Sequence, residues 1–218
     1  LRQLADNSSP GDIVYFQFSG HGQKMPDYNG DEQDGFDESI VTFNALRSPG
    51  YATPPLIYNG ELHFTDDELA PLLENIRNRI GPSGELIAVF DACYSRGLEK
   101  GGDDEWPEDF DLDSLPEFIR GSSDIFLPSD KSYLLAIPAP QVFKAGCPTA
   151  VITACLENER NFEVKINGKY YGSLSYCISL LLRNNVPLHQ WIPYFQSGAF
   201  RSSNCFQPFQ HPSITLYK

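Results

Sequence analysis

Three short apolar runs, each followed at once by small or polar residues, constrain the fold of this chain most strongly. They are "DIVYFQF" (12–18), "ELIAVF" (85–90) and "TAVITA" (149–154), and Gly, Pro or Asp bounds each of them. Continuous runs rich in Val, Ile and Phe are typical of strands that are buried on both faces of a sheet. A length of 218 residues suits one substantial core, so we expect a single domain over residues 1–218.

Two segments between and after these runs have helical patterns. In "TDDELAPLLENIRNRIG" (65–81), Thr65 is a good N-cap, Glu68 completes a capping box and Gly81 ends the helix. A second helix is predicted over "GSLSYCISLLLRNN" (172–185), with an Asn near its end. Strands that alternate with helices predict an α/β fold with a mostly parallel central sheet, flanked by helices on both faces.

Two further segments interrupt this pattern. Residues 23–63 are rich in Gly, Asp and Pro, and we interpret them as a long insertion between a strand and a helix. Residues 95–131 are acidic and rich in turn formers, which predicts a mobile surface loop. Ligands of an open parallel sheet bind beyond the carboxyl ends of its strands, which is where both segments begin.

Charge and cysteine content narrow the function. There are 29 acidic and 16 basic residues, and a net charge of -13 favours basic peptides or divalent metals over nucleic acids and anionic membranes. The five cysteines form no CxxC pair, which argues against a disulfide framework or structural zinc and favours a reducing, cytoplasmic location. No apolar run approaches the ~20 residues that span a bilayer.

The start "LRQLADN" reads as the end of a helix, so we expect missing upstream sequence.

A histidine and a cysteine follow the first two strands. His21 lies in "SGHGQ" and Cys93 in "DACYSRG". Adjacent parallel strands deliver both side chains to one rim, where an imidazole can accept the thiol proton and yield a thiolate. Gly20 and Gly22 allow close approach of a peptide, and the backbone N–H groups of Gly22 and Cys93 would form an oxyanion hole.

Each of these residues also has an ordinary structural interpretation. Cys93 alone is more often a buried thiol, and His21 alone a turn residue. Their joint placement at the ends of two buried strands favours the catalytic interpretation. The remaining histidines, His63, His189 and His211, have unremarkable surroundings and are interpreted as structural.

Six blocks of the sequence, in order, support a family resemblance. They are "YFQFSGHG", "DGFDESIV", "TDDEL", "VFDACYSRG", "VITACLENE" and "YYGSLSYCISLLL". They resemble the successive blocks of the caspase-like cysteine peptidases, and most of all the metacaspases and bacterial metacaspase-like proteases. The resemblance extends from about residue 12 to about residue 183. It implies a caspase-like fold and a cysteine endopeptidase, a hydrolase with His21 and Cys93 as its catalytic dyad.

The chain departs from the family pattern in two places. The usual metacaspase block has His and then Ser-Gly after the cysteine, whereas this chain has Tyr94, Ser95, Arg96 and Gly97. The family also begins with a strand and a helix upstream of the histidine strand. Their absence favours a processed or truncated piece over a sheet edge that is built differently.

Asp91, two residues before the cysteine, is the predicted substrate-binding residue. In the family this position lines the pocket for the side chain that precedes the scissile bond. A carboxylate there favours Arg or Lys through a charge-assisted hydrogen bond, so we expect a polypeptide substrate with a basic residue at that position. The alternative is that Asp91 only caps the following turn.

The resemblance also implies one cofactor, Ca²⁺. Many metacaspases bind calcium through acids of the blocks that read "DGFDE" and "DDE" here. Carried over, this indicates Asp34 or Asp37 together with Asp66 and Asp67, and hard carboxylate oxygens suit Ca²⁺. Glu99, Asp103 and Asp104 are the candidates for a further acid after the cysteine. A solvated acidic loop beside a helix N-terminus is the alternative.

Self-cleavage after the catalytic cysteine is common in the family. The basic residues available there are Arg96, Lys100, Arg120 and Lys131, and Arg120 precedes the turn-forming "GSSD".

Two rival functions stay open. One is the caspase-like domain of a larger sensor or defence protein with different specificity, and the other is an inactive, calcium-responsive scaffold domain. An upstream fragment or a larger assembly is a further partner in the first case.

Overall fold

The structure is a computed structural model of the chain. It describes residues 1–32, 34–46, 50–53, 56–93, 125–128, 146–156, 159–196 and 210–217. Most of the predicted acidic loop over residues 95–131 lies outside these ranges.

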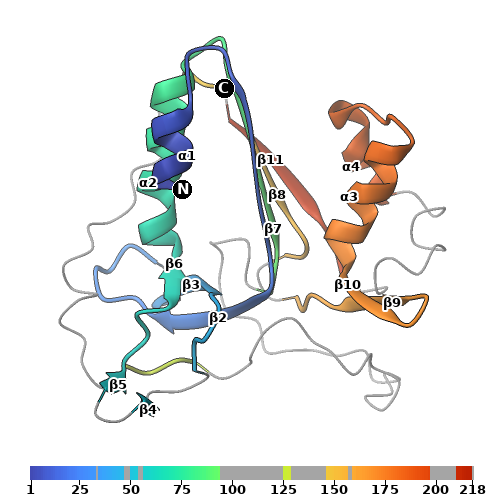
Figure 1. The fold of residues 1–218 in the computed structure, drawn as a ribbon. Helices are drawn as coiled ribbons and strands as arrows, with labels where there is room; N and C mark the ends of the chain where they lie inside the picture. Colours follow the sequence, from blue (N-terminus) through green and yellow to red (C-terminus); the bar gives the residue numbers. More distant parts are fainter. Residues whose placement is uncertain are drawn as a thin grey trace.

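A four-stranded sheet in the order β1-β7-β8-β11 forms the centre of the molecule (Figure 1). β1 (Ile13–Ser19), β7 (Glu85–Asp91) and β8 (Thr149–Thr153) are parallel, and they correspond to the three predicted apolar runs. β11 (Ser213–Tyr217) adds an antiparallel edge, which was not predicted. The α/β class with a mixed, mostly parallel sheet is therefore confirmed.

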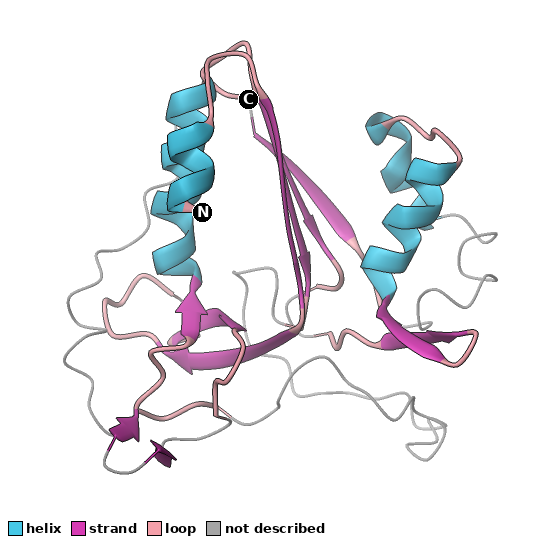
Figure 2. Cartoon of the chain, in the orientation of Figure 1, coloured by secondary structure: helices cyan, strands magenta, loops and turns pink. Residues whose placement is uncertain are grey.

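Helices cover both faces of this sheet (Figure 2). α1 (Arg2–Asn7) and α2 (Asp66–Ile80) lie on one side, and α3 (Ser173–Arg183) and α4 (Trp191–Gln196) lie on the other. The 3-10 helix η3 (Leu188–Gln190) leads into α4. α2 has the predicted capping box between Thr65 and Glu68 and ends at Gly81, whose φ of 66° suits a residue without Cβ.

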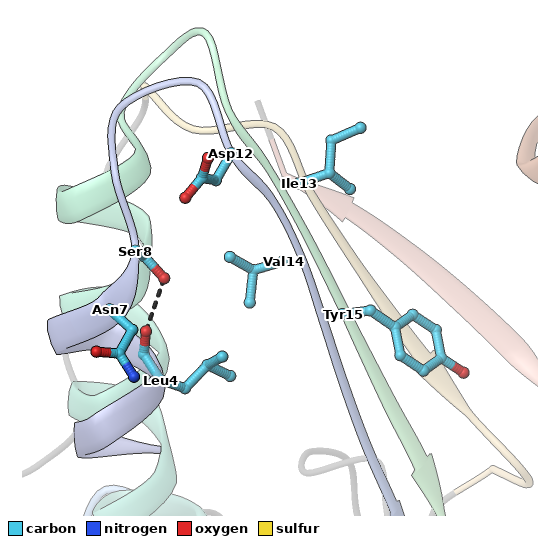
Figure 3. A pocket seen from close by; sticks show the side chains of 7 residues that line it. All are labelled: Leu4, Asn7, Ser8, Asp12, Ile13, Val14 and Tyr15. Atoms are coloured by element: carbon cyan, nitrogen blue, oxygen red, sulfur yellow. Dashed lines mark hydrogen bonds between the residues drawn. The ribbon is translucent and has the colours of Figure 1, made fainter.

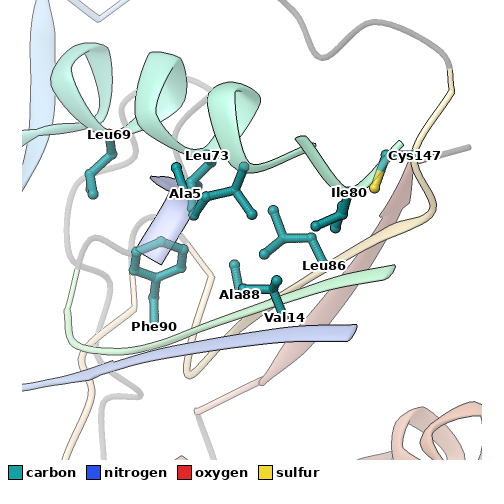
Figure 4. Close-up of a cluster of buried hydrophobic side chains, with 10 residues drawn as sticks. Ala5, Val14, Leu69, Leu73, Ile80, Leu86, Ala88, Phe90 and Cys147 are labelled. Atoms are coloured by element: carbon teal, nitrogen blue, oxygen red, sulfur yellow. The ribbon is translucent and has the colours of Figure 1, made fainter. Parts of the chain in front are cut away.

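The sheet separates two hydrophobic clusters, as expected for strands that are buried on both faces. Alternate residues of β7 serve the two sides, since Leu86, Ala88 and Phe90 face α2 whereas Val89 faces α3. Figure 4 shows the cluster on the α2 side of the sheet, in which Leu69, Leu73 and Ile80 of α2 pack on the strands. This packing fixes the ends of β1 and β7 relative to each other.

Residues 21–65 contain strands where the sequence indicated an irregular insertion. β2 (His21–Pro26), β3 (Phe36–Val41) and β6 (His63–Thr65) form an antiparallel sheet in the order β2-β3-β6. β4 (Gly50–Thr53) and β5 (Leu56–Tyr58) form a separate pair. β2 reads "HGQKMP" and has no apolar run, which is why hydrophobic patterning did not reveal it.

A second hairpin precedes α3. β9 (Glu163–Ile166) and β10 (Lys169–Gly172) are antiparallel, and β10 runs directly into the helix. The Asn167–Gly168 turn has positive φ at both residues, as a tight hairpin requires. This hairpin sets the position of the α3 N-terminus.

Within the part of the chain that the structure describes, no helix is long and apolar enough to cross a membrane. Cys93, Cys147, Cys155 and Cys177 are all buried.

Candidate active site and acidic cluster

The pairing of β1 with β7 brings the histidine and cysteine blocks together. The two strands are parallel and in register up to Ser19 opposite Asp91. The ladder is extended by a hydrogen bond from the Gly20 N–H to the Asp91 carbonyl, at 3.1 Å. His21 and Cys93 each lie two residues beyond that last pair, so both emerge at the same rim of the sheet.

Gly22 lies against the backbone of Cys93. A Cβ built on Gly22 would come within 1.9 Å of the Cys93 carbonyl oxygen and 3.4 Å of the Ser39 carbonyl oxygen. A side chain cannot occupy that space, so glycine is required here for close approach rather than for an unusual φ. The contact makes the start of β2, with the exposed His21 at its first position, a neighbour of Cys93.

The Cys93 thiol is buried, with 2% of the residue exposed. The backbone N–H of Asn161 donates a hydrogen bond to its sulfur at 3.1 Å, and the Asn161 carbonyl lies 3.7 Å from the same sulfur. A neighbouring thiol, that of Cys155, points at the Ala92 carbonyl at 3.7 Å. The nucleophile candidate therefore sits among backbone groups that come from two different strand ends.

Asp91 is fully buried and both of its carboxylate oxygens accept hydrogen bonds. Oδ1 accepts from Asn161 Nδ2 at 2.7 Å, and Oδ2 accepts from the backbone N–H of Ser175 at 2.8 Å and from Ser19 Oγ at 3.4 Å. Ser175 lies in the first turn of α3, so Asp91 caps a helix that is distant in sequence. The exposed Ser19 and the half-buried Ser175 are hydrogen-bonded to each other beside this carboxylate.

The acidic residues gather at the opposite end of the β2–β3 hairpin from Gly22. Carboxylate oxygens of Asp27, Asp31 and Asp37 all lie within 4.8 Å of one another. Asp66 and Asp67 begin α2 beside them, and Asn29 Nδ2 donates a hydrogen bond to Asp67 Oδ2. Among the described residues, Oδ1 of Asp37 and Oδ1 of Asp66 are buried and have no hydrogen-bond partner.

Burial and mutual repulsion strongly perturb these carboxyl groups. Burial, followed by the charges of Asp66 and Asp67, raises the pKa of Asp37 to about 8. Burial is also the main cause that raises the pKa values of Asp66, Asp67 and Glu32, each to about 7, with neighbouring carboxylates adding to the effect. Such a group of oxygens, two of them without a donor, fits a hard divalent cation.

The predicted metal ligands are not all in this cluster. Asp37, Asp66 and Asp67 are part of it, together with Asp27 and Asp31, which were not predicted. Asp34 instead forms an ion pair with Lys24, with 2.6 Å between Oδ2 and Nζ, and its Oδ1 accepts from the Phe36 N–H. Lys24 also lies 3.6 Å from Glu38, so Asp34 belongs to a neighbouring ion-pair group.

A buried aromatic cluster supports the hairpin between these two regions. His63 is buried and hydrogen-bonds to Tyr58 Oη at 2.5 Å and to Gln23 Oε1 at 2.8 Å, and burial lowers its pKa to about 4. The Phe126 ring stacks on His63, with 4.4 Å between centroids, and the Phe126 N–H donates to the Lys24 carbonyl of β2 at 2.8 Å. His63 thus has structural partners, and Phe126 ties a later part of the chain to β2.

The other two histidines lie in other segments, His211 before β11 and His189 in η3. His211 Nδ1 pairs with Glu159 Oε1 at 2.5 Å, and His189 is exposed at η3. Several predicted residues lie outside the described residues, so the structure does not place them. They are Tyr94, Ser95, Arg96, Gly97, Glu99, Lys100, Asp103, Asp104, Arg120 and Lys131.

One pocket lies far from these residues, at the amino end of β1. Leu4, Asn7 and Ser8 of the α1 segment line it together with residues 12–15, and Figure 3 shows Ser8 bonded to the Leu4 carbonyl. Ligands of parallel sheets bind at the opposite, carboxyl end of the strands. This pocket is therefore not a candidate for the active site.

Comparison with known proteins agrees with the sequence blocks. Residues 1–99 match the family model of the metacaspase, peptidase C14 domain. Metacaspase-1A and metacaspase-1B of Aspergillus terreus are 34% and 32% identical over 95 residues, which make up 44% of this chain. The matched stretch spans about a fifth of the length of these relatives, 20% and 21% respectively.

A solved structure matches the whole fold. The crystal structure of a Geobacter sulfurreducens protein aligns over 99% of this chain and 69% of its own, with a TM-score of 0.57 and 16% identity. At that identity the likeness concerns the fold alone. The family match depends on residues 1–99, and this range contains the whole of the "SGHG" block and of the "DACYSRG" block. Through these residues the chain is similar to the metacaspase, peptidase C14 domain, which belongs to a family of cysteine peptidases.

Proposed function

We propose that this protein is a cysteine endopeptidase in which Cys93 is the nucleophile and His21 its acid–base partner. The observation that carries the proposal is the register of β1 against β7, which brings the two blocks to one rim. The contact between Gly22 and the Cys93 carbonyl supports the same arrangement. A buried structural cysteine would need neither a histidine beside it nor a glycine against its backbone.

The proposed reaction has two halves. The Cys93 thiolate attacks the peptide carbonyl carbon, and the N–H groups of Gly22 and Cys93 stabilise the resulting oxyanion. When the C–N bond breaks, the His21 imidazolium gives its proton to the leaving amine. Water then attacks the thioester while His21 takes one of its protons, which releases the acid product and the free cysteine.

Asp91 is the proposed determinant of specificity for Arg or Lys before the scissile bond. Its carboxylate is buried, and the hydroxyls of Ser19 and Ser175 lie beside it on the more exposed side. A guanidinium that approached from that side would form a charge-assisted hydrogen bond in a poorly solvated place. The contrasting interpretation is that Asp91 serves only as the cap of α3.

We further propose that the acidic cluster binds Ca²⁺. Asp37 and Asp66 supply the buried oxygens without donors, and Asp27, Asp31 and Asp67 are the remaining candidate ligands. A bound cation would neutralise their mutual repulsion and fix the far end of the β2–β3 hairpin. Because β2 begins at His21, this would stabilise the segment that carries the acid–base partner.

Self-cleavage at Arg120 is the fourth part of the proposal. Phe126, six residues later, is fully buried against β2, the strand that begins at His21. We expect incubated wild-type protein to yield fragments that end at Arg120 in mass spectrometry, whereas Cys93→Ala stays intact. The same cut in both proteins would show that another protease makes it.

A panel of fluorogenic peptides tests the function directly. Peptides that end in Arg, Lys or Asp should be compared with and without calcium, with Cys93→Ala as the matched inactive variant. We expect turnover of the Arg and Lys peptides that depends on Cys93 and increases with calcium. No turnover of any peptide, together with no alkylation of Cys93, would reject the peptidase and favour a scaffold domain.

A further inference from the structure

Asn161 contacts both Asp91, the last residue of β7, and Cys93, two residues after it. It lies between the end of β8 and the start of β9, and it is completely buried. Its backbone N–H donates to Cys93 Sγ at 3.1 Å, and its side-chain Nδ2 donates to Asp91 Oδ1 at 2.7 Å. One residue therefore connects the nucleophile candidate with the carboxylate two positions before it.

The side chain of Asn161 is fixed from both ends of its amide. While Nδ2 faces the carboxylate, Oδ1 accepts hydrogen bonds from Ser173 Oγ at 2.9 Å and from Gln210 Nε2 at 2.8 Å. Gln210 Nε2 also contacts Ser173 Oγ at 2.6 Å and the Ala154 carbonyl at 3.1 Å. The network joins the ends of β7 and β8, the first residue of α3 and the segment before β11, so Asn161 has little freedom to move.

We infer that Asn161 is a positioning residue for the nucleophile, because the bond of its side chain to Asp91 keeps its own backbone N–H on the sulfur of Cys93. The inference rests on the proposed function. An N–H that points at sulfur stabilises the thiolate more than the thiol, since hydrogen bonding to the charged form favours that form. No atom is transferred, and the residue acts only through its donor and its placement.

Other titratable or charged groups near this contact bear on any pH measurement. On the described elements around Cys93 they are His21 on β2, Asp91 on β7, Cys155 after β8, and Glu159, Arg160 and His211 in the segments beside Asn161. His21 favours the thiolate when it is protonated, whereas Asp91 opposes it. A change at Asn161 must therefore be read as a shift of the whole pH profile relative to wild type.

The first test compares Asn161→Ala with Asn184→Ala. Asn184 is exposed at the end of α3, where its Nδ2 donates to the Leu180 carbonyl, so it is a matched control. We measure alkylation of Cys93 by iodoacetamide from pH 5 to pH 10, by mass spectrometry of its peptide, well below the melting temperature of each variant. We expect the half-maximal pH of Asn161→Ala to rise by about one unit, which lowers the rate at acidic pH about tenfold.

A second variant separates positioning from space filling. Asn161→Asp keeps the size of the side chain and the acceptor for Ser173, but it places an oxygen where Nδ2 donates to Asp91. We expect a shift at least as large as that of Asn161→Ala. A wild-type profile for either folded variant would overturn the inference.

The outcomes also separate this inference from the proposed function. A shifted Cys93 profile in protein that hydrolyses no peptide would retain the role of Asn161 and reject the peptidase. Peptide turnover by wild type, with an unshifted profile in both variants, would retain the peptidase and reject the role of Asn161.

Discussion

The two candidate functional regions of this protein differ in how their charges are balanced. At the β1–β7 rim, both oxygens of the buried Asp91 have hydrogen-bond donors from Asn161, Ser175 and Ser19. In the acidic cluster, Asp37 and Asp66 each have a buried oxygen with no partner among the described residues. Hydrogen bonds within the fold therefore balance the charge of the first region, whereas we propose that a cation offsets the repulsion in the second.

The two regions are joined by one hairpin. β2 starts at His21 beside Cys93 and ends at Pro26, directly before Asp27 of the cluster. Substitutions at the rim should abolish peptide hydrolysis whether or not calcium is present. Substitutions in the acidic cluster should act through the hairpin, so they should first change the stability of the protein and its response to calcium.

Gly22→Ala tests the rim most severely. Since its Cβ would lie 1.9 Å from the Cys93 carbonyl oxygen, the backbone of one segment must move. A displacement of about 1 Å or the loss of one oxyanion donor lowers turnover by about 10²–10³-fold, so we expect a fall of that size in kcat/KM. In Gly20→Ala, the Cβ meets only the end of the Phe18 ring, and activity should remain close to wild type. Equal activity of the two variants would refute the proposed close contact.

Asp91→Asn tests whether the carboxylate sets specificity or only caps α3. Loss of one partner from a buried charge pair costs about 2–5 kcal/mol, so kcat/KM for Arg peptides should fall by about 30-fold or more. Asn is as good a cap as Asp, but its Nδ2 would face one of the donors that now bond to the carboxylate, so the melting temperature should also fall. A loss in stability without a change in the preference for Arg would leave Asp91 as a cap.

The acidic cluster predicts a specific dependence of stability on pH. The pKa values of Asp37, Asp66 and Asp67 are raised above the values in the unfolded chain, so the folded state binds more protons. The free energy of unfolding that these protonated groups contribute is fully present below about pH 4, and it is lost as the pH rises through about 7 to 8. In EDTA, the melting temperature measured by circular dichroism should therefore fall from pH 5.5 to pH 8.5.

Calcium should reverse this trend. At a concentration 100-fold above Kd, calcium adds about 2.7 kcal/mol to the free energy of unfolding. This raises the melting temperature by roughly 5–10 °C for a chain of this size, with the larger gain at pH 8. Asp37→Asn should lose most of the gain, whereas Asp34→Asn should retain it because Asp34 pairs with Lys24. An equal loss in both variants would mean that the response does not arise from the cluster.

Ser19→Ala should have the smallest effect. Its hydroxyl lies 3.4 Å from Asp91, and a hydrogen bond of this kind contributes about 0.5–1.5 kcal/mol. We therefore expect kcat/KM for Arg peptides to fall about 3–10-fold, with Tyr15→Phe as the exposed control for loss of a hydroxyl from the same strand. A loss as large as that of Asp91→Asn would indicate that Ser19 contacts the substrate directly.

The sequence predicts the parts of this molecule that depend on local pattern. The three parallel strands and α2 follow from apolar runs and the Thr65 capping box, and the placement of His21 and Cys93 after strands follows with them. β2 was missed because its residues are polar and its burial depends on Phe126, more than a hundred positions later in the chain. Tertiary contacts of this kind leave no periodic signal.

The residues missed at the two sites have the same explanation. Asn161 and Ser175 reach Asp91 only because β8, β9 and α3 converge there. Asp27 and Asp31 join the cluster through the turn that follows β2, where Asp27 accepts the N–H groups of Asn29, Gly30 and Glu32. The clustered acids of "DYNGDEQDGFDES" were visible in the sequence, but their distribution between a cation site and Lys24 was not.

The rate of Cys93 alkylation at pH 6.5, in wild type and in His21→Ala, tests the central claim most directly. The assay needs no knowledge of the substrate, and His189→Ala is a matched control because His189 is exposed at η3. If the strand register makes His21 the partner of Cys93, removal of the imidazole should slow alkylation about tenfold or more, while His189→Ala reacts like wild type. Equal rates in all three proteins would show that His21 and Cys93 do not act as a pair.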